Sequence, residues 1–268
     1  MKSSLFYNTD SLILSVLLFL GIVLFYFLGF KISQHQRRRN PENEPAGFGP
    51  FEGAMLGLLS LLLGFTFNMA ASRFDMRKEQ ILHEANCIGT VLLRADLYPD
   101  SVRREFRSDL EVYIKERIQY YEAGGDEKEI KLSLQKANSI SERIWNRAAI
   151  ISQKNEVVIK SMQMVPAVNE MIDVVTSREE IRNAHVPESI FGMLFILCFA
   201  GSFIVGYSCK SKKADLVILF SYSLMTVMTV YLILDLDKPR QGIINTSLTH
   251  QNMYDLQNSF HENAEVKK

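Results

Sequence analysis

The sequence has few cysteines, one tryptophan and no excess of charge of either sign. Its 268 residues include 3 Cys and 1 Trp, and 30 Lys and Arg balance 30 Asp and Glu. Cys87, Cys198 and Cys209 are too few and too scattered for a disulfide framework or a metal cluster. Binding to nucleic acid needs a concentrated basic face, so nucleic acid is not expected as a partner.

Motifs of known enzyme classes are also missing. The segment from His83 to Cys87 begins like a zinc-protease helix but lacks the second histidine four residues on. There is no glycine-rich phosphate loop and no serine elbow, and the five histidines are dispersed. The sequence therefore predicts no catalytic residue, no metal site and no cofactor.

Charge is nearly absent from four long stretches. Only Glu52, at the edge of the second, breaks the pattern in Ser11–Phe30, Phe51–Ala71, Ser189–Tyr207 and Leu216–Leu234. A bilayer core about 30 Å thick is crossed by about 20 apolar residues at 1.5 Å each. These stretches predict four transmembrane helices in contact with lipid. The first could instead be a cleaved signal peptide, but its run is too long and a basic flank, Arg37 to Arg39, follows it.

The predicted domains follow from these spans. Residues 1–71 hold the first two spans and a basic loop, 72–188 an extramembrane domain, 189–237 the other two spans, and 238–268 a tail. Within 72–188, apolar residues recur at helical spacing and Pro99, Gly124–Gly125 and Pro166 punctuate the helices. The fold class is therefore an all-α membrane protein with four transmembrane helices and a helical extramembrane bundle.

Loop charge indicates an orientation in the membrane. Lys31–Pro50 carries four basic residues, and the short loop Ser208–Asp215 carries Lys210, Lys212 and Lys213. Basic short loops stay in the cytoplasm, which places the extramembrane domain on the opposite side. Arg73, Arg77 and Lys78 flank the second span there and weaken this argument.

Polar residues line up beside two of the apolar stripes. Asn86, Thr90 and Arg94 lie four apart on one expected helix, near Glu84, and Asn169 and Asp173 lie four apart on another. Such residues form a solvated face or a structural hydrogen-bond network, or alternatively a polar vestibule or ion-pair latch between neighbouring helices.

One face of the second span stands out. Gly53 and Gly57 form a pattern of small residues that lets helix backbones approach closely. Gly57, Leu61 and Phe65 share a face that leads towards Asn68. Around a shared axis this face would form a narrow apolar ring, and such rings gate ions by dewetting. The alternative is that the face packs against other spans of the same subunit.

Charges gather at the end of the fourth span. Asp235, Asp237 and Arg240 lie at the predicted membrane border. They can pair with neighbouring charges, or form a charged ring at a pore mouth or a weak cation site, and they do not identify calcium.

Three stretches together carry a family resemblance. They are Leu63–Asp75 continuing into Glu84–Thr90 and Arg94, then Asn169, Asp173 and Arg178, then Asp235–Gly242. This set resembles the bestrophin-like (DUF4239) family of bacterial membrane proteins, which implies the fold and an inner-membrane location but carries no settled activity.

A weaker resemblance to bestrophins proper rests on Leu63-Gly64-Phe65 followed by Arg73 and Phe74. Bestrophins are pentameric anion channels whose second span lines a hydrophobic neck. That likeness implies a neck at Gly57, Leu61 and Phe65, looser and less aromatic than theirs, and a cytoplasmic helical domain. We therefore expect a homo-oligomer that conducts small ions, with a non-conducting scaffold or sensor as the alternative.

Overall fold

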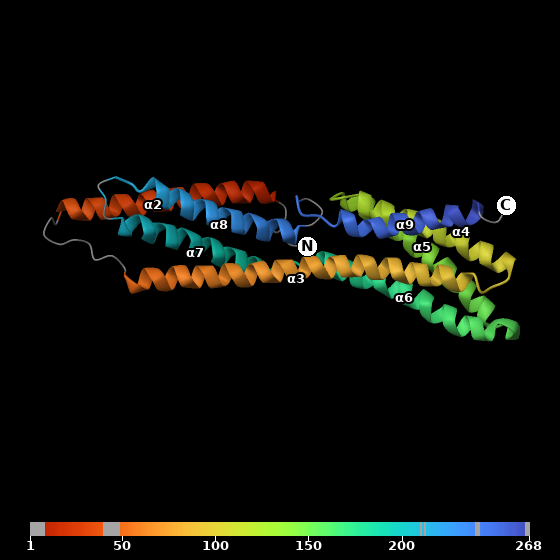
Figure 1. Ribbon diagram of the computed structural model, residues 1–268. Coiled ribbons are helices and arrows are strands. Elements are labelled where there is room, and N and C mark those ends of the chain that lie inside the picture. Colours follow the sequence, from red (N-terminus) through yellow and green to blue (C-terminus); the bar gives the residue numbers. More distant parts are fainter. Residues whose placement is uncertain (1–8, 40–48, 210, 212, 239–241, 266–268) are drawn as a thin grey trace. The chain divides into compact units, whose positions relative to one another are not determined.

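The computed structural model describes residues 9–39, 49–209, 211, 213–238 and 242–265 (Figure 1). Lys210, Lys212 and Arg240 lie outside these residues. The described residues form α-helices, one short 3₁₀ helix (η1) and no strand, which confirms the all-α class. The elements are α2 (Ser11–Arg39), α3 (Pro50–Ala95), α4 (Asp100–Glu122), α5 (Glu127–Ser152), η1 (Asn155–Val157), α6 (Val158–Asn183), α7 (Glu188–Ser208), α8 (Leu216–Asp237) and α9 (Ser247–Glu265).

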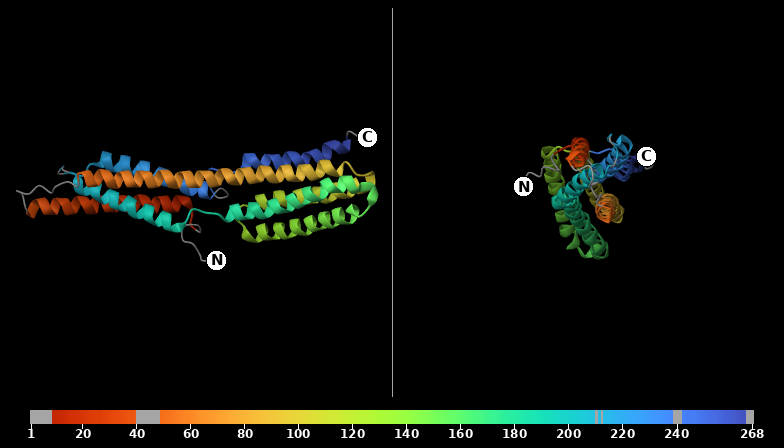
Figure 2. Two further views of the ribbon diagram at one scale, coloured as in Figure 1. Left: turned by 90° about the horizontal axis from the view of Figure 1, so that it is seen from below. Right: turned by 90° about the vertical axis from the view of Figure 1, so that its left-hand side faces the viewer.

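The four predicted membrane spans are confirmed. Within the described residues, four helical stretches are long and apolar enough to cross a bilayer. They correspond to α2, the first part of α3, α7 and α8. Beyond the second predicted span, α3 continues without a break to Ala95, as the lack of any helix-breaking residue there predicts (Figure 2).

The chain divides into two units. The membrane unit comprises residues 1–74 and 185–244, and the helical unit comprises residues 75–184 and 245–268. The sequence predicted boundaries between residues 71 and 72 and between residues 188 and 189, each within a few residues of the boundaries between these two units. The tail differs more, because it contains helix α9, whose Met253 and Phe260 are buried in the core of the helical unit.

In the membrane unit, α2 packs against α7 and α8. Small residues set this packing: a Cβ added at Gly29 would lie 2.1 Å from the carbonyl oxygen of Phe203, and one at Gly206 would lie 2.1 Å from that of Tyr26. Ser202 on α7 donates a hydrogen bond of 2.6 Å to the Ile22 carbonyl on α2. Close backbone approach with a polar cross-link is how helices associate where hydrophobic burial supplies no driving force.

The helical unit is a bundle around an aliphatic core. Ile88, Leu110, Ile144 and Val168 are among its fully buried side chains, one each from α3, α4, α5 and α6. The Asp126 carboxylate accepts hydrogen bonds from the first amides of α5, which satisfies donors that a helix start leaves free. Pro166 lies inside α6 rather than at its start.

Candidate functional site

The face of α3 that carries Gly57, Leu61 and Phe65 is uncovered in the membrane unit. Leu61 is 55% exposed and Phe65 is 61% exposed. Nothing lies within 4 Å of a Cβ built at Gly57. Among the residues that the structure describes, this face therefore does not pack against the other spans of the same chain.

The opposite face of α3 provides the packing. Leu59, Thr66 and Ala70 are buried there, and Leu59 and Ala70 belong to the apolar core of the membrane unit. The first part of α3 is therefore attached to its unit by one side and leaves the other side free.

The uncovered side of α3 also carries a stripe of small and polar residues. All five lie on one helical face and are exposed: Gly53, Gly57, Ser60, Gly64 and Asn68. A lipid-facing helix has no need of such a stripe, whereas a second helix can approach it closely. An amide such as that of Asn68 is costly to leave in hydrocarbon without a partner. This side of α3 is thus suited to another protein surface or to water.

Glu84, which the sequence placed beside a polar stripe, lies at the centre of a buried ion cluster in the helical unit. Its carboxylate pairs with Arg117 on α4 and Arg178 on α6, and the side chains of Glu84 and Arg117 are completely buried. Burial by itself would raise the pKa of Glu84, but the charges of Arg117 and Arg178 outweigh that effect and lower it to about 2. Glu84 is therefore ionised.

Aromatic rings and one histidine complete this cluster. The Arg117 guanidinium lies over the Tyr120 ring at 4.6 Å from its centroid. Arg178 contacts Nε2 of His250 on α9 at 2.8 Å, and Nδ1 of His250 lies 2.9 Å from the Thr246 carbonyl. Because a carbonyl only accepts, Nδ1 carries a proton and Nε2 accepts from Arg178. The cluster thereby joins α3, α4, α6 and α9.

The remaining residues of the predicted polar network do not join this cluster. Asn86 is exposed, Thr90 donates to the backbone of Asn86 at 2.8 Å, and the Arg94 guanidinium donates to the carbonyl of Gln163. The solvated-face interpretation fits this stripe, because Asn86 is exposed and the side chains of Thr90 and Arg94 bind backbone carbonyls.

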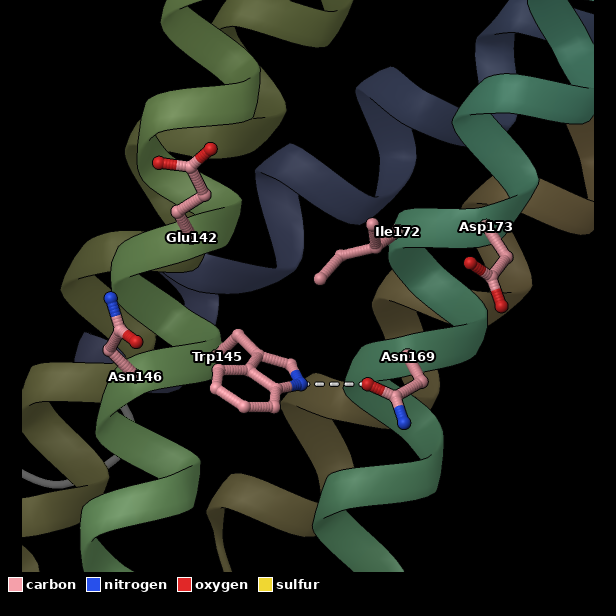
Figure 3. Close-up of a pocket in the computed structure, with 6 residues that line it drawn as sticks. All are labelled: Glu142, Trp145, Asn146, Asn169, Ile172 and Asp173. Atoms are coloured by element: carbon pink, nitrogen blue, oxygen red, sulfur yellow. Dashed lines mark hydrogen bonds between the residues drawn. The ribbon is translucent and has the colours of Figure 1, made fainter.

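Asn169 and Asp173 lie on α6, where Asn169 is directed at α5 and Asp173 extends from the other side of the helix (Figure 3). The Asn169 side-chain oxygen accepts a hydrogen bond of 2.8 Å from the Trp145 indole (Figure 3). These two residues line an open pocket of about 470 Å³ together with Trp145, Glu142, Asn146 and Ile172. Both are exposed, so they form part of a surface groove and not of a buried network.

Asp235 and Asp237 do not form an exposed charged ring. Each is 1% exposed. Asp235 accepts the amide hydrogens of Ile243 and Ile244 at 3.1 and 2.8 Å, and Asp237 accepts that of Val186 at 3.2 Å. These carboxylates fix the chain where α8 ends, because they bind backbone donors. Arg240, predicted beside them, lies outside the described residues.

Sequence reasoning missed Arg117 and His250. A signal for Arg117 existed, because it falls in the apolar stripe of α4, four residues after Tyr113 and four before Tyr121. A charge in an apolar stripe needs a buried partner. His250 gave no comparable signal, because the tail was not expected to pack against the bundle.

Comparisons with known proteins agree with this architecture. A family model described as a bestrophin-like domain matches residues 16–250. No curated protein matches the chain.

Solved structures of a bacterial bestrophin homologue from Klebsiella pneumoniae share the fold. One mutant form has a TM-score of 0.68 and 15% sequence identity, and the match covers 93% of this chain and 99% of that one. A second mutant form has a TM-score of 0.67 and 13% identity, with 91% and 98% covered.

Proposed function

The chain belongs to the bestrophin-like family, and we propose that it assembles with copies of itself into a membrane channel for small ions. In this proposal the first part of α3 lines the conduction path. Gly57, Leu61 and Phe65 form the neck, and Asn68 follows on the side towards the helical unit. Lipid contacts the outer surfaces of α2 and α8.

The observation that carries the proposal is the uncovered face of α3. α2, α7 and α8 pack on one another, while α3 presents Leu61, Phe65 and a stripe of small and polar residues that none of the described residues covers. Single-chain packing accounts for the buried residues of α3 but gives no role to this stripe. An assembly around an axis gives it one, because neighbouring copies of α3 can approach closely at the glycines.

The chemistry of the neck suits a gate. A ring of Leu61 and Phe65 side chains around a narrow axis would exclude water when closed and would pass ions when widened, which is gating by dewetting. Glycine at position 57 leaves the first level of the neck wider than the other two. Permeation of anions is the expectation that the family resemblance supplies.

Ion flux tests the proposal. The purified chain in liposomes should release chloride faster than empty liposomes do, and Phe65→Ala and Leu61→Ala should change that rate at least about threefold. Phe220→Ala is the matched control, since Phe220 on α8 is equally exposed at 62% but belongs to a surface assigned to lipid. No flux from a folded, reconstituted oligomer would contradict conduction and favour a scaffold or sensor.

A further inference from the structure

Three side chains with metal-binding atoms meet in the helical unit: His83 and Glu170 are exposed and Cys87 is buried beside them. His83 and Cys87 lie one turn apart on α3, and Glu170 faces them from α6. One ligand atom from each falls within 4.8 Å of the others. Nε2 of His83 is 4.0 Å from Sγ of Cys87 and 3.9 Å from Oε1 of Glu170.

We propose that His83, Cys87 and Glu170 bind a zinc ion. Imidazole, thiolate and carboxylate are the ligand types that zinc takes in proteins, at about 2.0–2.3 Å. Two such ligands around a tetrahedral ion lie about 3.3–3.6 Å apart. The two separations from His83 are 3.9 and 4.0 Å and all three are within 4.8 Å, so side-chain movements of about 1 Å would bring the ligand atoms to those values.

Charge and ligand softness favour zinc over magnesium or calcium. Burial raises the pKa of Cys87 to about 11, so zinc would displace the thiol proton to solvent on binding, and the resulting thiolate and the Glu170 carboxylate would together balance the divalent ion. Magnesium and calcium prefer oxygen ligands only, whereas nitrogen and sulfur ligands select zinc and related transition metals. Glu84 is adjacent in sequence but is already bound to Arg117 and Arg178, so it does not contribute.

The spacing on α3 explains how the sequence builds the site. Residues four apart share one helical face, as in the zinc-protease helix, where two histidines take these positions. Here Cys87 occupies the second position, so the missing histidine did not remove a ligand. The third ligand comes from α6, 83 residues further along the chain, which hides the site from a search for local motifs.

The surroundings leave room for a fourth ligand. An open groove of about 420 Å³ is lined by two of the three side chains, His83 and Glu170, together with Gln80, Asn169, Asp173 and Ser177, among others. Oε1 of Gln80 is buried and has no hydrogen-bond partner among the described residues. A water molecule in the groove can complete the coordination, and Gln80 lies in the same lining. A bound ion would then link α3 to α6.

Metal titration of the whole protein tests the site. Tag-free protein in detergent, treated with a chelator and dialysed, is titrated with Zn²⁺ and, in parallel, with Co²⁺. We expect one tightly held zinc ion per chain and a thiolate-to-cobalt charge-transfer band. Cys87→Ser should abolish the band, and Glu170→Gln and His83→Asn should weaken zinc binding more than about 10-fold. Cys209→Ser, which removes a more exposed thiol, should change neither.

If Cys87→Ser does not fold, the variants of His83 and Glu170 still test the site. Both are surface residues, so their replacement should leave the core intact. Unchanged zinc affinity in both of their variants would overturn the proposal. A cobalt band that persists in Cys87→Ser, or the absence of stoichiometric zinc in the wild type, would overturn it equally. Ion flux is not needed for the readout, so the result stands independently of the proposed channel.

Discussion

Arg117 and Glu84 form an ion pair in which neither side chain has any exposure to solvent. Arg178 binds the same carboxylate, so one buried negative charge serves two guanidinium groups. Removing that charge would leave two cations without a counter-ion in the core of the helical unit.

Replacing Glu84 should destabilise the helical unit strongly. Glu84→Gln keeps the shape of the side chain but removes its charge, and breaking a buried ion pair costs about 3–5 kcal/mol. Thermal or denaturant unfolding followed by circular dichroism measures the effect. Glu79→Gln, at an exposed position of the same helix, should change stability by no more than about 0.5 kcal/mol. Equal effects of the two substitutions would show that the cluster does not hold the bundle.

The Glu84 carboxylate should also make the free energy of unfolding depend on pH. The pKa of Glu84 falls from 4.5 to about 2 in the folded protein because two arginines favour its charged form. A carboxyl whose pKa is lower in the folded than in the unfolded state stabilises the fold at pH values above its unfolded pKa. This contribution is lost as the pH falls from about 4.5 towards 2. The stability difference between wild type and Glu84→Gln should therefore be constant near neutral pH and shrink over that acid range. A difference that grows on acidification would contradict the assignment.

The sequence predicted the membrane helices because long uncharged runs have few alternatives to spanning lipid. It also predicted the helical bundle from its stripes. It did not predict that α9 packs against the bundle, since α9 buries only a few apolar residues, such as Met253 and Phe260, and much of its attachment is polar. Helical spacing alone did not distinguish that surface from a solvated tail.

The candidate site was predicted less completely. The sequence predicted that Gly57, Leu61 and Phe65 share one face of α3, because one helix contains all three and helical spacing fixes their directions. The partners of Glu84 lie 33 and 94 residues away, and the third zinc ligand lies on another helix. Such contacts depend on how helices pack, which spacing along one helix does not give. For the same reason Asp235 and Asp237 looked like border charges although they bind backbone amides.

The α2–α7 crossing should not tolerate side chains at its glycines. A Cβ at Gly206 would lie 2.1 Å from the Tyr26 carbonyl oxygen, so Gly206→Ala must push the helices apart. We expect a loss of about 1–3 kcal/mol, the usual cost of overpacking. Size-exclusion chromatography after heating in detergent would measure it. Gly192→Ala on the same helix is the control, because nothing lies within 4 Å of a Cβ there.

Gly57 should behave differently from Gly206. In the described part of the chain, nothing lies within 4 Å of a Cβ at Gly57, so Gly57→Leu should leave the fold and thermal stability of each subunit unchanged. In the proposed assembly the same leucine would fill the widest level of the neck and reduce ion flux at least about 10-fold. Normal flux through Gly57→Leu would argue that α3 does not surround the path.

The most direct test of the account asks whether residue 65 faces the conduction path. In a background in which Cys209 is serine, Phe65→Cys is recorded in planar bilayers before and after a charged thiol reagent that does not cross lipid. If α3 lines the path, the reagent should block most of the current through Phe65→Cys and should leave the current through Phe220→Cys unaffected. Current that persists after complete modification of residue 65 would contradict it.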